Sequence, residues 1–352
     1  MPRIARVDER LLAVDMPALA EVSDLAIGSE DVLLLCAGFE DRAVAAISRA
    51  IESGSGGFGV LAIGYLPVLA ANRLEDLRAQ CRVGGARWAT ATYNRQNPEG
   101  AGAEIMAALA GSTGRIVLDV SGMSRLLIVQ MVVALSEVEW GLERTLLVYA
   151  EAEEYPPTEV EVDQALGQMK SRALCQEMFL SSGVFGITVL PELASASLEG
   201  QPIRLVAFPS FNVHQLAALR IELQPSHYTV IHGKPHLEKN TWRLEKIRRL
   251  NRTDSVPSRE DCVASTFDYR ETLRALLRVY GEHGATQRIV ISPTGSKMQA
   301  LAVGLFRSVV TDAQVVYPTP RTFAAPERYT KGVHALWGLP LAAFAGLAFR
   351  GE

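Results

Sequence analysis

The clearest indication of the fold comes from the segment Arg288-Ile-Val-Ile-Ser-Pro-Thr-Gly-Ser-Lys-Met-Gln-Ala-Leu-Ala-Val-Gly-Leu-Phe306. Its apolar run predicts a short buried strand, and the Ser-Pro-Thr-Gly-Ser sequence that follows predicts a turn. Apolar residues then recur at helical spacing from Met298 onward. A helix that begins directly after a strand leaves backbone N–H groups without partners at its first turn, and Lys297 adds a positive charge there. The segment therefore predicts a strand, a turn and a helix arranged to suit an anion.

A second segment, Arg115-Ile-Val-Leu-Asp-Val-Ser-Gly-Met-Ser-Arg-Leu-Leu-Ile-Val129, has the same order of features, 173 residues earlier in the chain. Other landmarks of the two halves recur at displacements between 168 and 174 residues. Such a recurrence is typical of an internal duplication, although two generic units of one fold would share part of it. At a displacement of 173 the turns align as Ser121 with Thr294, Gly122 with Gly295, and Ser124 with Lys297.

Apolar runs alternate with helical patterns along both halves of the chain. The runs at 32–37, 59–65, 116–120, 145–149 and 203–208 are typical of strands that are covered on both faces. Strands that alternate with helices imply right-handed crossovers and a parallel sheet. The predicted fold class is therefore α/β, with two tandem Rossmann-like, doubly wound parallel-sheet units related by internal duplication.

The boundary between the predicted units falls in the acidic segment 151–163, which also contains two prolines and is interpreted as a solvated connector. We expect a first unit at 1–163 and a second at 164–352. Further along the chain, a helix is predicted at 165–179 and a strand at 186–190. The apolar tail at 335–349 is predicted to be a buried terminal helix or a contact between two copies of the chain.

Composition limits the class of protein. With 352 residues, 48% of them hydrophobic, the chain is long enough for two full cores. Its net charge of −4 gives no overall basic field for nucleic acid, and its four scattered cysteines indicate a reducing compartment. The amino-terminal residues contain no apolar signal core, and the longest apolar run is too short to cross a bilayer. We expect a cytoplasmic protein without membrane contact.

Candidate binding residues lie at the four predicted strand ends where ligands of open parallel sheets bind, next to the first strand of each unit. Backbone N–H groups, hydroxyls and cations at these turns would form a phosphate cradle. The alternative is that the serines and threonines only cap the helices that follow. The predicted ligand-binding residues are Gly38, Glu40, Arg42, Ser121, Ser124, Arg125, Ser210, Asn212, Thr294, Gly295, Ser296 and Lys297.

Other patterns carry less weight. Neither a Gly-x-Gly-x-x-Gly nor a P-loop motif occurs at the turns, which argues against a standard dinucleotide or NTPase loop. The basic segment 234–252 contains Trp242 and would suit a polyanion, but a solvated helix face is the preferred interpretation. His227, His232 and His236 are close in sequence without a cysteine beside them, so neither a metal site nor another cofactor is predicted.

The turn Ser-Pro-Thr-Gly-Ser-Lys-Met, between a strand and a helix, resembles the signature turn of CARF domains, the CRISPR-associated Rossmann-fold sensors of cyclic oligoadenylates. That turn typically reads Thr-Gly-Gly-Thr-Lys-x-Met, and Thr294, Gly295, Lys297 and Met298 match it in kind. Here the turn is shorter, and the corresponding turn of the first half lacks a lysine. Two unequal halves in one chain resemble SAVED domains, which fuse two CARF-like units. The specific match covers about ten residues.

The resemblance implies a sensor in antiviral defence that binds a cyclic oligonucleotide or related nucleotide second messenger in a cleft between the two units. Phosphates would be bound by Lys297, Thr294, Ser296, Arg125 and Ser121, and bases or riboses by Glu40 and Asn212. An effector protein or a second copy of the chain is the expected partner. One alternative is a nucleotide-processing enzyme, of the phosphodiesterase or ring-nuclease kind, that uses the same cleft. A further alternative is a scaffold that uses only its surface.

Overall fold

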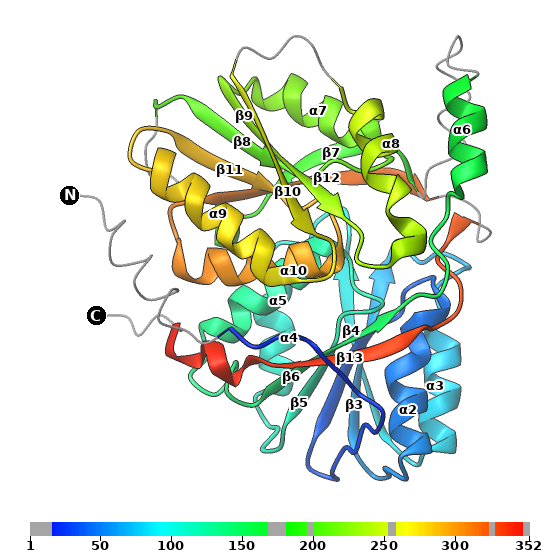
Figure 1. The fold of residues 1–352 in the computed structure, drawn as a ribbon. Coiled ribbons are helices and arrows are strands. Elements are labelled where there is room, and N and C mark those ends of the chain that lie inside the picture. The colour runs from blue at the N-terminus through cyan, green and yellow to red at the C-terminus, as the bar shows by residue number, and fades with distance from the viewer. Residues whose placement is uncertain (1–15, 168–180, 196–199, 253–257, 324–327, 348–352) are drawn as a thin grey trace. The chain divides into compact units, whose positions relative to one another are not determined.

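The computed structural model describes residues 16–167, 181–195, 200–252, 258–323 and 328–347. The described residues of Asp15–Pro156 and Tyr329–Glu352 form one compact unit, called the first unit below. Those of Pro157–Arg328 form another, called the second unit. In the ribbon of Figure 1, each unit is built around its own sheet.

The sheet of the first unit is mostly parallel. Its strands lie in the order β1-β13-β6-β5-β2-β3-β4, and only β1 and β13 run antiparallel to their neighbours. The leucine-rich strand β2 pairs with β3 on one side and with β5 on the other, as expected for an apolar run in the middle of a sheet. The strands are β1 (Ala20–Glu21), β2 (Val32–Cys36), β3 (Gly59–Leu66), β4 (Arg87–Asn94), β5 (Ile116–Asp119), β6 (Thr145–Glu151) and β13 (Ala335–Pro340).

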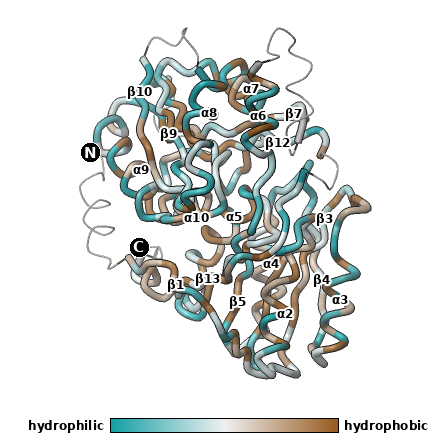
Figure 2. Tube along the Cα trace, turned by 45° about the vertical axis from the view of Figure 1, so that its right-hand side comes forward, coloured by the Kyte–Doolittle hydropathy of each residue, from teal (hydrophilic) through white to brown (hydrophobic). Residues whose placement is uncertain are grey.

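Helices α2 (Ala45–Glu52) and α3 (Leu74–Val83) bury Ile47 and Leu77 in one core with alternate residues of β2, such as Leu33. Helices α4 (Ala101–Leu109) and α5 (Arg125–Ser136) contact each other and lack members in that core. Almost every residue of α5 is buried, which explains its continuous apolar sequence. Figure 2 shows hydrophobic residues running along the strands of this sheet.

The sheet of the second unit has the order β10-β9-β8-β11-β12-β7, in which only β7 runs antiparallel to its neighbour. Its core combines residues of β8, β9 and β11, such as Leu205, Val230 and Val290, with Leu219 of the helix that follows β8. The strands are β7 (Ser181–Val189), β8 (Ile203–Ala207), β9 (His227–Lys234), β10 (Arg259–Ser265), β11 (Arg288–Ser292) and β12 (Gln314–Phe323). The helices are α6 (Glu159–Gly167), α7 (Val213–Leu223), α8 (Trp242–Leu250), α9 (Tyr269–His283) and α10 (Lys297–Val309).

The two sheets share one strand order. Numbered within its own unit, the parallel part of each sheet runs 3-2-1-4-5, with β2 and β8 as the first strands. This is the order of a Rossmann-like, doubly wound sheet, so the predicted α/β class with two parallel-dominated sheets is confirmed. Each sheet also has an antiparallel strand beside its fifth strand, but β7 comes before the parallel strands of its unit in the chain and β13 comes after those of its unit.

Two segments differ from the sequence-based expectation. The tail predicted as a terminal helix forms strand β13, which pairs with β6 of the first unit, and then a 3-10 helix, Leu341–Leu347. The alternation of buried and less buried residues in Ala335–Pro340 suits a strand beside β6. The acidic segment interpreted as a connector contains the beginning of α6, whose Val162 and Leu166 are buried. Beyond Gly167, the predicted helix 165–179 lies outside the described residues.

In the described part of the chain, no helix is long and apolar enough to cross a membrane.

Candidate functional site

The strand order determines where the predicted turns lie. In each sheet the first strand pairs with the fourth, β2 with β5 and β8 with β11. The second and third strands lie on one side of this pair and the fifth strand lies on the other, so the strand order reverses here. Ligands of doubly wound sheets bind at the carboxyl ends of such a strand pair. Residues 38–42 and 121–125 therefore lie at this edge of the first unit, and residues 209–214 and 294–297 lie at the same edge of the second.

The serines of the first unit's turn form structural hydrogen bonds. Ser121 is fully buried, and its Oγ accepts a hydrogen bond of 2.8 Å from the backbone N–H of Ala150 in β6. Its own N–H donates to Oδ1 of Asp119 at 2.8 Å. Ser124 is the N-cap of α5, where its Oγ accepts the N–H of Leu127. The Ser124 hydroxyl therefore caps α5, and the Ser121 hydroxyl bonds the turn to β6.

Tyr65, which the sequence analysis did not select, also occupies this turn. Its hydroxyl accepts the N–H of Ser124 at 2.7 Å and donates to the carbonyl of Gly122 at 3.1 Å. Burial raises the pKa of Tyr65 well above its ordinary value, so the phenol stays protonated. The Arg95 guanidinium lies over the Tyr65 ring, 3.8 Å from its centroid. A tyrosine at the carboxyl end of the predicted strand 59–65 was the sequence signal for this contact.

Two charged candidates of the first unit, Glu40 and Arg42, are paired with each other. Arg42 is buried and forms an ion pair of 2.7 Å with Glu40. It also donates to the hydroxyl of Tyr149 at 3.0 Å. Burial would lower the pKa of Arg42, but Glu40 and the tyrosine hydroxyls hold that pKa above its ordinary range. Gly38 lies so close to the neighbouring turn that a Cβ would stand 2.9 Å from the Cα of Gly122.

In the second unit, the turn before α10 is held by a similar set of bonds. Thr294 is buried, and its hydroxyl donates to the carbonyl of Phe208 at 2.7 Å. Ser296 caps α10 in a capping box: its Oγ accepts the N–H of Gln299, whose Oε1 accepts the N–H of Ser296. A Cβ at Gly295 would stand 2.1 Å from that Oε1 atom, so only glycine fits there.

The candidates after β8 are also part of the local structure. Ser210 accepts the N–H of Asn212 on its Oγ at 3.1 Å. Its carbonyl accepts the side-chain amide of Asn251 at 2.9 Å. Asn212 is buried at the N-cap position of α7. These contacts define the shape of the turn and leave the ligand-binding roles of both residues as predictions.

The two cations occupy the same place in their units. Arg125 is the first residue of α5 and Lys297 the first residue of α10, after the N-caps Ser124 and Ser296. Both side chains are half-buried. The helix starts therefore align Ser124 with Ser296 and Arg125 with Lys297, which corrects the alignment of Ser124 with Lys297. The correction arises because the first unit's turn has one additional residue between its glycine and its N-cap.

The three clustered histidines have separate partners. His227 contacts the hydroxyl of Ser258, and His236 packs its ring on Phe267. His232 is bonded to Asp261 at 2.7 Å. Burial lowers the pKa of His232 and outweighs the opposing effect of Asp261. Burial would raise the pKa of Asp261, but hydrogen bonds from Arg259 and His232 hold it below its ordinary value.

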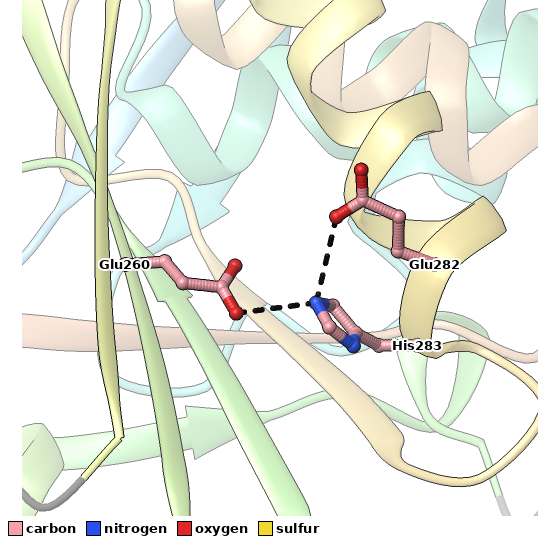
Figure 3. Close-up of side chains that lie close together, drawn as sticks. All are labelled: Glu260, Glu282 and His283. Atoms are coloured by element: carbon pink, nitrogen blue, oxygen red, sulfur yellow. Dashed lines mark ion pairs between the residues drawn. The ribbon is translucent and has the colours of Figure 1, made fainter.

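A different group of metal-ligating side chains lies near the amino end of β10. Figure 3 shows Glu260 and Glu282 on either side of His283, with its Nε2 atom 3.3 Å from Glu260 and 3.7 Å from Glu282. Glu260 also pairs with the buried Arg204 at 3.1 Å. The exposed Glu260 carboxylate is therefore shared between the Arg204 guanidinium and the His283 ring, so the group is part of a network of polar contacts within the second unit.

The basic helix α8 is partly neutralised within its unit. Lys246 pairs with Asp163 of α6, and Arg248 pairs with Glu245 at 2.9 Å. The Arg243 guanidinium lies over the ring of Phe211 and donates to the carbonyl of Pro157. Pairing and packing on α6 support the interpretation of 234–252 as a structural, solvated helix face.

No protein-family model matches this chain, and no curated protein matches it. Among solved structures, the chain is similar to Can2 from Sulfobacillus thermosulfidooxidans in complex with cyclic tetra-adenylate, at a TM-score of 0.26 and 17% identity. That match covers 32% of this chain and 31% of Can2, so it spans about a third of the length of Can2. The cytoplasmic domain of a prokaryotic cation chloride cotransporter is similar at a TM-score of 0.24 and 9% identity, over 82% of this chain and 94% of that one. At these TM-scores, neither likeness determines a family or a ligand.

Proposed function

We propose that this chain binds a nucleotide second messenger of the cyclic oligonucleotide class through its phosphates, at the turn before α10, as a sensor in antiviral defence. The observation that carries this proposal is the position of Lys297. It is the first residue of α10, at the carboxyl edge of the sheet where β8 and β11 lie side by side. Ligands bind at this position in doubly wound sheets.

The electrostatics of the helix start favour an anion. The first N–H groups of a helix carry partial positive charge, so a lysine at this position is unfavourable for the helix by itself. An anion bound there would interact favourably with both the lysine and the helix start. The phosphates of a nucleotide supply such an anion, and the resemblance of the turn to that of CARF domains supports a cyclic oligonucleotide as its source.

The contacts favour binding over cleavage. The hydroxyls of Ser121, Thr294 and Ser296 each take part in a hydrogen bond that holds a strand end or a helix start. A hydroxyl nucleophile would have to leave such a bond to attack a phosphate. Asp119 is fully buried and accepts the N–H of Ser121, so it is poorly placed as a general base.

The matched strand orders and helix starts support an internal duplication of one Rossmann-like unit. If the halves descend from one unit, the second is the half that carries the lysine typical of the CARF turn. The first has Arg125 at that position.

The test is calorimetric titration of the full chain with cyclic di-, tri-, tetra- and hexa-adenylate and with ATP, followed by chromatography of the nucleotide. The expected result is binding of a cyclic oligonucleotide that is recovered intact. Absence of binding across the series would contradict the sensor function, and recovery of cleaved product would favour the nucleotide-processing enzyme.

A further inference from the structure

The carboxyl edges of the two sheets differ at one strand position. Leu34 in β2 pairs with Leu61 in β3, and the corresponding residue Val206 in β8 pairs with Thr229 in β9. Tyr65 lies four residues after Leu61, and Gly233 lies four residues after Thr229. The tyrosine that bonds the turn of the first unit is therefore replaced by glycine in the second.

In the first unit, the chain itself uses three backbone donors of the turn, those of Ser121, Met123 and Ser124. The Tyr65 hydroxyl accepts the N–H of Ser124, and Asp119 accepts that of Ser121. The N–H of Met123 bonds to the carbonyl of Val120. An anion at this turn would have to displace the phenol, which is also held by Gly122.

In the second unit, Gln299 presents a donor at the corresponding place. Its side chain is 1% exposed, and its Oε1 accepts the N–H of Ser296 at 2.9 Å. Because that N–H can only donate, the atom facing it is the oxygen, and the remaining atom is the NH2 group. This Nε2 is buried and has no hydrogen-bond partner among the residues that the structure describes. It lies 3.7 Å from the position that a Cβ of Gly233 would take.

A buried NH2 group without an acceptor leaves a hydrogen bond unmade, and an oxygen of a bound ligand would supply it. Lys297, two residues before Gln299, begins the helix whose N-terminal dipole favours negative charge. A donor, a cation and a helix start together suit a phosphoryl oxygen. Gly233 leaves this side of the turn without the phenol ring that fills the first unit's turn.

We infer that Gln299 is a ligand-binding residue, that its Nε2 donates to a phosphoryl oxygen beside Lys297, and that phosphate binding is confined to the second unit. This inference extends the proposed function, and the biological role of the site rests on that function. The site itself requires only a phosphate group and not a whole nucleotide. The tyrosine-filled turn of the first unit is then a structural counterpart without a ligand.

The experiment is a calorimetric titration of the full chain with pyrophosphate, the simplest probe of a phosphoryl site. The decisive variant is Gln299→Glu, because a carboxylate oxygen still accepts the N–H of Ser296 and keeps the capping box while the NH2 donor is lost. Gln96→Glu is the matched control, since it makes the same charge change at an exposed residue beyond β4 of the first unit. Melting temperatures establish that both variants are folded.

The expected result is one pyrophosphate per wild-type chain, binding at least tenfold weaker in Gln299→Glu, and unchanged binding in Gln96→Glu. Wild-type affinity in Gln299→Glu, equal weakening in both variants, two pyrophosphates per chain, or no binding by the wild type would each overturn the inference. If pyrophosphate binds as expected and no cyclic oligonucleotide does, the proposed function fails while the phosphate site stands.

Discussion

The phenolic oxygen of Tyr65 lies 2.7 Å from the backbone nitrogen of Ser124, so the end of β3 caps the turn that precedes α5. A side chain from a strand that is not adjacent to β5 in the sheet thereby satisfies a helix-start donor. The contact joins the end of β3 to the turn that follows β5, across the intervening strand β2. It also distinguishes the first unit from the second, where Gly233 takes the place of Tyr65.

Removing the Tyr65 hydroxyl is expected to destabilise the first unit. Tyr65→Phe leaves the half-buried N–H of Ser124 without its acceptor, at a cost of about 0.5–1.5 kcal/mol. Tyr228→Phe is the control, because the Tyr228 hydroxyl is buried without a hydrogen-bond partner in the described part of the chain. Urea unfolding should show a lower midpoint for Tyr65→Phe and an unchanged or higher one for Tyr228→Phe. Equal losses in both would show that the bond to Ser124 does not stabilise the fold.

The close approach of the strand ends makes Gly122 irreplaceable. A Cβ at this position would stand 2.1 Å from the carbonyl oxygen of Cys36, a backbone atom that cannot move away alone. Gly122→Ala should therefore cost about 1–3 kcal/mol or more through backbone shifts. Gly111→Ala is the control, because nothing lies within 4 Å of a Cβ there. Thermal melts that rank the two variants equally would contradict the packing of these turns.

The capping role of Ser296 predicts a loss of stability independent of any ligand. Ser296→Ala removes the acceptor for the N–H of Gln299 and should cost about 0.5–2 kcal/mol. Ser308→Ala, in the same helix, removes only a hydroxyl that bonds to the carbonyl of Gly304 and should be nearly neutral. Unfolding of the ligand-free protein measures both. A Ser296→Ala variant as stable as the wild type would mean that the hydroxyl is held for binding alone.

His232 should make the second unit sensitive to mild acid. Burial lowers the pKa of His232 in the folded protein below the ordinary value of 6.5, which applies to the unfolded chain. At a pH between the folded and the unfolded pKa, the unfolded chain therefore binds more protons than the folded one. The free energy of unfolding should therefore fall as the pH drops below about 6.5. In His232→Gln, the decline between pH 7 and pH 5 should be shallower, while His334→Gln, at an exposed position, should keep the wild-type slope. Parallel slopes in all three proteins would exclude His232 as the cause.

Much of the fold was predictable because the strands are short apolar runs and the helices follow them closely. The run at 32–37 corresponds to β2, and the Ser-Pro-Thr-Gly-Ser turn does separate β11 from α10. The tail was not predictable, because the pairing of β13 with β6 depends on residues almost two hundred positions apart. A short apolar run does not by itself distinguish a strand from a helix.

The candidate site, like the fold, was predictable only in part. The sequence placed the turns correctly at neighbouring strand ends, since β2–β5 and β8–β11 pairing follows from the doubly wound order. It could not show that the hydroxyls of Ser121 and Thr294 form structural hydrogen bonds, because their partners are distant in sequence. Ser121 accepts from the N–H of a residue in β6, and Thr294 donates to a carbonyl at the end of β8. Gln299 was visible as the third residue of a capping box after Ser296, but the unused NH2 group appears only in the folded chain.

The central claim is that Lys297 binds a phosphate, and the most direct measurement is calorimetric binding of a cyclic oligonucleotide to Lys297→Ala. We expect the variant to bind about tenfold to a hundredfold more weakly, a loss of roughly 1.5–3 kcal/mol for a hydrogen bond to a charged group. Its melting temperature without ligand should be unchanged or slightly raised, because a cation is removed from a helix N-terminus. Lys297→Arg should restore binding only in part, since a planar guanidinium differs in shape from an ammonium. A Lys297→Ala variant that binds normally and melts earlier would show that Lys297 is structural and would contradict the account.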